Sequence, residues 1–240
     1  MNAMAGGGSF LSFPAMLGVG VAPIEANATN TVALWPGQLT SVAALRGDLR
    51  RDLLPLIIGT SILGGVAGAE VLLHTRQVTF LHLIPWLLLI GTLIFGVSGP
   101  ISRWLRTRAR TAEVEHHGEP KINQFALFFA LLPVCFYIGY FGAGAGFLIM
   151  TVLALFGMEQ IHQLNALKVV AACASNLCAV LTFILSGRIL WHYCLISMVF
   201  AAAGGLIGAN YAKRMNANIL RAVVVSTGII IAAYFFWKQH

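Results

Sequence analysis

The sequence predicts an all-α integral membrane protein, and three observations support that fold class. Hydrophobic residues make up 58% of the 240-residue chain, charged residues make up only 10%, and the mean hydropathy is +0.83. Apolar segments of membrane-spanning length recur along the chain, and glycine-rich stretches interrupt two of them. A soluble domain of this length needs a largely polar surface, which this composition cannot supply. The lipid bilayer is therefore the first partner that the sequence implies.

The apolar segments predict seven to eight transmembrane helices. A helix needs roughly 20 predominantly apolar residues to cross a bilayer. No alternation of apolar and polar residues favours strands instead. Short polar intervals separate the candidate segments, which are 5–21, 26–45, 53–73, 79–101, 123–157, 164–185, 190–212 and 219–237.

Glycine is concentrated at two places where the apolar pattern would otherwise predict an unbroken helix. Glycine costs roughly 1 kcal/mol relative to alanine inside a helix, so such clusters favour a break or a very close backbone approach. A broken helix is tolerated in a membrane only where protein buries it or where it lines a cavity. A packing seam of small residues between helices is the alternative. The clusters are Gly6, Gly7 and Gly8 in the first half and Gly142, Gly144 and Gly146 in the second.

The two halves of the chain align with each other, which is typical of an internal repeat. A shift of 138 positions pairs identical residues in order along the first part of each half, and a shift of 140 continues the match toward the C-terminus. The glycine clusters coincide in this alignment, so we expect the two broken helices to meet at the interface between the repeats. Identical pairs include Gly6 with Gly144, Gly8 with Gly146, Asn27 with Asn165, Leu39 with Leu177, Gly64 with Gly204 and Gly68 with Gly208.

The alignment also divides the chain into domains. Residues 1–101 form the first repeat, 102–121 a basic cytoplasmic linker and 122–240 the second repeat. The linker carries five positive residues and the pair His116 and His117, for which a solvated loop is favoured over a metal site. The second repeat has an apolar stretch before its glycine cluster that the first repeat lacks, so we expect that the amino-terminal helix has been lost or that the chain is truncated upstream of Met1.

The distribution of arginine and lysine predicts the orientation of the repeats. Positive residues cluster between the second and third segments and in the 102–121 linker, which places both intervals in the cytoplasm. In the second half the bias reverses, because the interval with Arg188 has one positive charge and the next interval has three. This reversal favours inverted repeats, although a parallel arrangement is also compatible with such small counts.

Polar residues that follow the glycine clusters are candidates for a substrate site. A helix that begins after a break presents free N–H groups and the positive end of its dipole, which together attract an anion. Lys168 is the most informative residue, since a lysine in an apolar helix costs about 2.5–3.5 kcal/mol and is usually kept for function. The alternative is that the Lys168 side chain snorkels, so that its ammonium reaches the membrane–water interface and binds no ligand. The predicted polar site residues are Asn27, Thr29, Asn30, Asn165, Lys168 and Asn176.

These motifs resemble the TauE/SafE family of bacterial membrane proteins, described as sulfite or organosulfonate exporters, over nearly the whole chain. The resemblance is carried by the two glycine clusters, by 13–17 and 26–31, and by 165–168 and 204–209. The short amino end and Thr151, where the family often has proline, depart from the pattern. The resemblance implies export of a small sulfur-containing anion, such as sulfite, sulfoacetate or another organosulfonate, across the bacterial inner membrane.

The remaining features exclude some functions and leave others open. No GxxxxGK[ST] stretch is present to bind ATP, so we expect secondary transport without a cofactor. The net charge of +7 reflects loop residues, so no nucleic acid is expected, and the four cysteines suggest packing rather than a metal site. The alternatives are a membrane-embedded enzyme, an assembly partner or a transporter of a different anion. The sequence also permits a homodimer.

Overall fold

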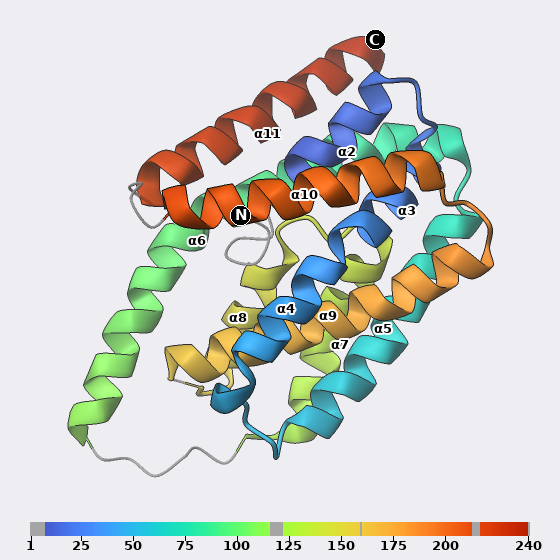
Figure 1. The fold of residues 1–240 in the computed structure, drawn as a ribbon. Coiled ribbons are helices and arrows are strands. Elements are labelled where there is room, and N and C mark those ends of the chain that lie inside the picture. Colours follow the sequence, from blue (N-terminus) through green and yellow to red (C-terminus); the bar gives the residue numbers. More distant parts are fainter. Residues whose placement is uncertain (1–7, 116–121, 159, 213–216, 240) are drawn as a thin grey trace.

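The computed structural model describes residues 8–115, 122–158, 160–212 and 217–239, and within them the chain is helical with no strand (Figure 1). The predicted all-α class is therefore confirmed for these residues. The helices are α2 (Ser9–Gly18), α3 (Pro23–Leu34), α4 (Pro36–Ala44), the short 3-10 turn η1 (Arg46–Asp48), α5 (Leu54–His74), α6 (Gln77–Glu115), α7 (Gln124–Tyr140), α8 (Ala145–Leu155), α9 (Ile161–Leu185), α10 (Trp191–Ala212) and α11 (Ala217–Gln239).

Three helical stretches among the described residues are long and apolar enough to cross a membrane by length and composition. Shorter apolar helices of 10–17 residues accompany them. These helices support a membrane protein, while the count of seven to eight spanning helices and the domain boundaries stay predictions. The three long stretches are Leu54–His74, Gln77–Ile94 and Ile161–Leu185, and the shorter ones are Gln124–Tyr140, Ala145–Leu155, Trp191–Ala203 and Val225–Trp237.

The glycine break predicted in the second half is present between α7 and α8. Helix α7 ends at Tyr140, and Gly142 and Gly144 both adopt φ of +78°, a left-handed conformation that glycine adopts without steric cost. A Cβ atom on Gly144 would lie 2.9 Å from the carbonyl oxygen of Gly91 on α6. Because Phe141, Ala143, Gly144 and Ala145 are buried, the break lies inside the protein, as the cost of exposed backbone in lipid requires.

The apolar segment 26–45, predicted as one span, is divided in the structure. Helix α3 ends at Leu34 and α4 begins at Pro36, although Trp35 between them keeps helical backbone angles of −62° and −40°. Proline lacks the N–H that would continue the hydrogen-bond ladder and its ring crowds the preceding turn, which explains the interruption. The corresponding stretch of the second half, α9, contains no proline and is continuous.

The basic stretch predicted as a loop is helical over residues 102–115, since α6 continues to Glu115. The prediction of a loop was wrong there. No glycine or proline follows Pro100 within this stretch, and its arginine, alanine and leucine residues favour a helix even without burial. The linker's other residues, 116–121, including both histidines, lie outside the described residues.

Close helix packing at the centre of the bundle depends on glycine. Helix α5 packs against α7 and α9, where Cβ atoms on Gly65 and Gly68 would approach backbone atoms of the neighbouring helices to 2.5 and 2.1 Å. A Cβ atom on Gly139 of α7 would likewise lie 2.2 Å from the carbonyl oxygen of Gly65. Small residues at such interfaces let membrane helices approach closely and gain van der Waals contact.

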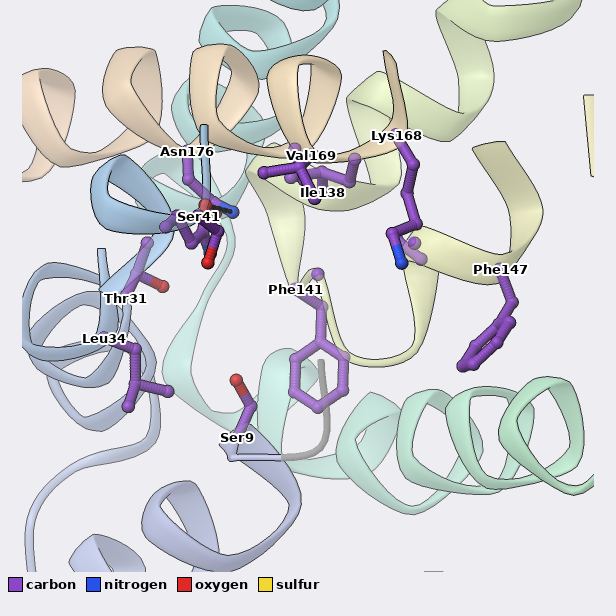
Figure 2. Close-up of a pocket in the computed structure, with 15 residues that line it drawn as sticks. Ser9, Thr31, Leu34, Ser41, Ile138, Phe141, Phe147, Lys168, Val169 and Asn176 are labelled. Carbon is purple, nitrogen blue, oxygen red and sulfur yellow. Dashed lines mark hydrogen bonds between the residues drawn. The ribbon is translucent and has the colours of Figure 1, made fainter. Parts of the chain in front are cut away.

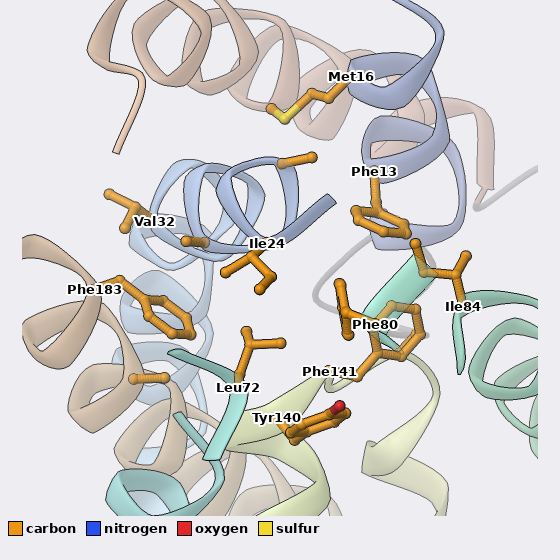
Figure 3. Packing of buried hydrophobic residues seen from close by; sticks show 14 of the residues in the cluster. Phe13, Met16, Ile24, Val32, Leu72, Phe80, Ile84, Tyr140, Phe141 and Phe183 are labelled. Atoms are coloured by element: carbon orange, nitrogen blue, oxygen red, sulfur yellow. The ribbon is translucent and has the colours of Figure 1, made fainter. Parts of the chain in front are cut away.

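A cluster of buried hydrophobic residues anchors the glycine break to the amino-terminal helices (Figure 3). The ring of Phe141, at the break, meets the ring of Phe13 on α2 edge to face at 5.5 Å. The ring of Tyr140 meets Phe80 on α6 in the same geometry at 5.8 Å. These contacts fix the break relative to α2 and α6, and so position the backbone that borders the cavity described next.

Candidate functional site

A cavity of about 80 Å³ lies between the start of α8, the middle of α9, the α3–α4 segment and the start of α2 (Figure 2). One water molecule needs about 10–15 Å³ on this measure, so the cavity has room for several non-hydrogen atoms. Its wall is both polar and apolar. The polar side chains that line it are Ser9, Thr31, Gln38, Ser41, Lys168 and Asn176.

Lys168 brings a positive charge to the cavity. Its side chain leaves α9 and its ammonium lies beside the start of α8 in Figure 2. Nζ donates to Oδ1 of Asn165, one turn earlier on α9, at 2.9 Å and lies 5.9 Å from the centre of the Phe147 ring. No carboxylate pairs with Lys168 among the residues that the structure describes. Lysine has three N–H donors, so two remain after the bond to Asn165.

The opposite side of the cavity is polar but uncharged. Nδ2 of Asn176 donates to Oε1 of Gln38 at 3.1 Å, which joins α9 to α4. The hydroxyl of Thr31 donates to the carbonyl of Asn27 at 2.9 Å, and the hydroxyl of Ser41 donates to the carbonyl of Gly37 at 3.0 Å. These groups therefore present hydroxyl and amide oxygens at one end of the cavity, away from Lys168.

The glycine break forms part of the cavity wall. Gly142, Ala145 and Gly146 line it, and a Cβ atom on Gly146 would lie 3.3 Å from Cδ of Lys168. Helix α8 begins here, so the positive end of its dipole lies on the same side as the ammonium, although the N–H groups of Ala145 and Phe147 donate to the carbonyl oxygens of Gly142 and Gly144 at 3.4 and 3.2 Å. The charge and the helix end together favour an anion at this side of the cavity.

The structure brings four of the predicted site residues to the cavity, namely Gly142, Gly146, Lys168 and Asn176. Asn165 supports Lys168 from α9. The amide of Asn27 donates to the carbonyl of Tyr140 at 3.1 Å, and the hydroxyl of Thr29 accepts from the N–H of Leu190 at 3.1 Å. Neither residue lines the cavity.

Three further predicted residues are described by the structure but do not line the cavity. Asn30 accepts a hydrogen bond from the hydroxyl of Ser12, and Gly144 is the N-terminal cap of α8. Gly8 immediately precedes α2. The predicted residues Gly6 and Gly7 lie outside the described residues.

Sequence reasoning missed several lining residues that the alignment of the halves could have indicated. Thr31, Leu34, Gln38 and Ser41 recur at helical spacing, which is the signature of one helix face. Gln38 stands 138 positions before Asn176, so it occupies the matching position of the first half. A search for polar residues on the same face as Gln38 would have added Thr31 and Ser41.

The apolar helices, the buried break and the cavity with its mixed polar and apolar wall define a helical membrane protein with a site for a small solute between its helices. The family described as "Sulfite exporter TauE/SafE" matches residues 1–235. The chain belongs to this family, which is one of membrane transporters.

Similar proteins with curated descriptions agree with that class. The chain is 24% identical to a probable membrane transporter protein, YfcA, of Escherichia coli K12 over 249 residues, which cover 100% of the chain and 86% of the relative. It is 27% identical to the probable membrane transporter protein ORF9 of a Sinorhizobium species, with 97% and 85% covered. A probable membrane transporter protein of Haemophilus influenzae is 25% identical, with 100% and 90% covered. No solved structure shows a significant match to the chain.

Proposed function

We propose that the chain is a secondary transporter that exports a small sulfur-containing anion across the bacterial inner membrane. The observation that carries this proposal is the ammonium of Lys168, which faces an internal cavity and has no carboxylate partner among the described residues. An unpaired charge at membrane depth costs several kcal/mol, and a ligand of opposite charge would offset that cost. An anionic ligand therefore explains why a lysine occupies this position. The family description supplies the sulfur-containing class.

Transport of an anion outward requires no nucleotide. A cell interior that is negative favours the exit of an anion by about 2.3 kcal/mol per charge per 100 mV. The sequence has no GxxxxGK[ST] stretch for ATP. The proposal is therefore a secondary mechanism, driven by the membrane potential or by an ion gradient, and transport that required added nucleotide would contradict it.

We also propose that the chain consists of two inverted repeats, and helix boundaries support this. Helix α9 begins at Ile161, 138 positions after α3 begins at Pro23. Helix α11 begins at Ala217, 140 positions after α6 begins at Gln77. Helix contacts follow the same correspondence, since α8 packs on α9 as α2 packs on α3, and α5 packs on α9 as α10 packs on α3.

The directions of matching helices support inversion rather than a parallel arrangement. Glu25, at the start of α3, accepts a hydrogen bond at 2.9 Å from Nη1 of Arg188, just beyond the end of α9. Figure 1 likewise draws α3 and α4 descending while α9 rises beside them. Matching helices that run in opposite directions are typical of repeats related by an axis in the membrane plane.

The cavity lies where such an axis would pass. Its lining includes pairs of residues at matching positions of the two halves, each 138 positions apart. Transporters built from inverted repeats bind substrate between discontinuous helices at this place. The matching lining pairs are Ser9 with Phe147, Thr31 with Val169, Leu34 with Ala172 and Gln38 with Asn176.

A binding isotherm and a flux curve on purified protein in sealed liposomes test the proposal. For sulfite and for ethanesulfonate, Lys168→Met should abolish or strongly weaken binding, while the protein stays folded and inserted because a costly charge has been removed. Lys168→Arg keeps the charge on a larger planar head and should shift affinity or selectivity without complete loss. Equal affinities in wild type and Lys168→Met would refute an anion site at Lys168.

The same liposomes separate transport from the alternatives. An embedded enzyme would convert the labelled anion, whereas a transporter delivers it unchanged to the other side of the membrane. An assembly partner would give no flux above that of protein-free liposomes. Unchanged label that crosses the membrane only with wild-type protein present is the expected result.

A further inference from the structure

The cavity has two chemically different ends, and this difference specifies the kind of anion it fits. Figure 2 shows Lys168 and the start of α8 on one side, Thr31, Ser41 and Asn176 on the other, and Ile138 and Val169 between them. A ligand that fills the cavity therefore meets a cation, then an apolar wall, then neutral polar groups.

The neutral end offers both acceptors and donors of hydrogen bonds and carries no charge. The hydroxyls of Thr31 and Ser41 donate to backbone carbonyls, and while these bonds are kept their oxygens can accept from a ligand. Oδ1 of Asn176 is a further acceptor, because the bond to Gln38 uses one N–H of its Nδ2. The second N–H of Asn176 and Nε2 of Gln38 are donors at this end, and they suit the oxygen of a ligand hydroxyl.

The two ends lie at different positions along α9. Residues 168 and 176 are eight positions apart, so their backbone positions are separated by about 12 Å along the helix axis. A compact inorganic oxyanion has all its oxygens on one atom and favours one end, whereas two or three carbon atoms between two polar groups let a ligand extend toward both.

We infer that the cavity selects a small organic acid in which one sulfonate or carboxylate group is joined by a short carbon linker to a hydroxyl or amino group that donates hydrogen bonds. This inference rests on the proposed transport function. The acid meets Lys168, the linker lies on Ile138 and Val169, and the donor meets Thr31, Ser41 and Asn176. A second acidic group is disfavoured, because no second cation lines the cavity among the described residues to offset its charge.

Calorimetric titration of the purified full chain with a matched series tests this inference. The probes are ethanesulfonate, 2-hydroxyethanesulfonate, 2-aminoethanesulfonate and sulfoacetate, which share one sulfonate and differ at the other end. One net hydrogen bond of about 0.5–1.5 kcal/mol corresponds to a gain of roughly 2- to 10-fold. We expect the hydroxy and amino compounds to bind by that factor more tightly than ethanesulfonate, and sulfoacetate to bind more weakly.

Variants connect this preference to the neutral end. Thr31→Val and Ser41→Ala should each reduce the preference, and the double variant should reduce it further, since the amide of Asn176 remains at this end. Thr40→Val is the matched control, because the exposed Thr40 hydroxyl also donates to the carbonyl of Gly37 but does not line the cavity. It should keep the wild-type preference.

The outcomes separate this inference from the proposed function. Equal affinities across the series, tighter binding of sulfoacetate, or a preference that is unchanged in the double variant would overturn the two-ended selectivity while leaving anion transport intact. If no sulfonate bound to wild type, or if Lys168→Met bound all four as wild type does, the proposed function itself would fail and this inference with it.

Discussion

Nδ2 of Asn176 donates a hydrogen bond of 3.1 Å to Oε1 of Gln38, a residue exactly one repeat length of 138 positions earlier in the chain. The indole N–H of Trp35 likewise donates to the carbonyl oxygen of Cys173 at 3.2 Å, across the same separation. Under two-fold symmetry, matching positions contact each other only near the axis. Both bonds therefore lie where the proposed repeats face each other, and a rocking motion between the repeats would have to break them.

A cross-link between positions 38 and 176 should stop transport. In a background in which the four native cysteines are replaced by alanine, Gln38→Cys with Asn176→Cys places two thiols at the side chains that now touch. A short thiol-specific cross-linker should halt flux in liposomes, and cleavage of the linker should restore it. Each single-cysteine variant, treated identically, is the control. Undiminished flux with complete cross-linking would show that α4 and α9 do not separate during transport.

The glycine interface of α5 predicts a difference between two alanine substitutions on one helix. A Cβ atom on Gly68 would meet the carbonyl oxygen of Phe136 at 2.1 Å, whereas one on Gly59 meets nothing within 4 Å. Overpacking costs about 1–3 kcal/mol, while alanine in an open helical site gains up to about 1 kcal/mol. Gly68→Ala should lower the melting temperature in detergent and Gly59→Ala should not. Equal melting temperatures would mean that α5 and α7 can separate without cost.

Much of the fold could be predicted from hydropathy and glycine placement, because the constraints of the bilayer are strong. The break near Gly142 follows from glycine clustering, and its burial follows from the cost of exposed backbone in lipid. The helix through 102–115 does not follow from hydropathy, because its high charge density is equally typical of a solvated loop, although arginine and alanine favour helices. The interruption at Pro36 does not follow from apolar length either, because a single proline can end a helix within an apolar segment.

A site residue could be predicted from the sequence where placing its side chain in an apolar helix costs free energy. Lys168 stands out in any apolar helix, and the structure places it at the cavity. Asn27 was indistinguishable from a ligand-binding residue in the sequence, yet its amide holds the carbonyl of Tyr140. Polar residues near a break serve either the ligand or the backbone that the break leaves unpaired, and only the three-dimensional arrangement separates the two roles.

The hydrogen bond from Asn27 to the carbonyl of Tyr140 predicts the order in which two substitutions of Asn27 lower the stability of the protein. Asn27 is buried, and its Nδ2 supplies a hydrogen bond to the carbonyl of Tyr140, the last residue of α7 before the break. Asn27→Ala leaves that carbonyl short of a partner, at a cost of about 1–3 kcal/mol. Asn27→Asp should be worse, since it turns an acceptor toward the carbonyl and buries a charge. Melting temperatures in detergent should fall in the order wild type, Asn27→Ala, Asn27→Asp, and an Asp variant as stable as wild type would contradict this role.

Gly144 predicts a combined effect of strain and steric contact on the anion site. Its φ of +78° disfavours a residue with a side chain by roughly 1–3 kcal/mol, and a Cβ atom would also lie 2.9 Å from the carbonyl oxygen of Gly91. Gly20 has φ of +85° but would meet nothing within 4 Å, so Gly20→Ala reports the strain alone. We expect Gly20→Ala to lower the melting temperature slightly and to leave sulfonate affinity unchanged.

Gly144→Ala should lower the melting temperature further and also weaken sulfonate binding, because the start of α8 must move away from α6 and so change its position relative to Lys168. Gly144→Leu should abolish binding by obstructing the break. Calorimetric titration with ethanesulfonate, together with melting curves for all three variants, measures both effects on the same protein samples. If Gly144→Ala matched Gly20→Ala in both quantities, the contact with Gly91 would have no part in holding the start of α8 at the cavity.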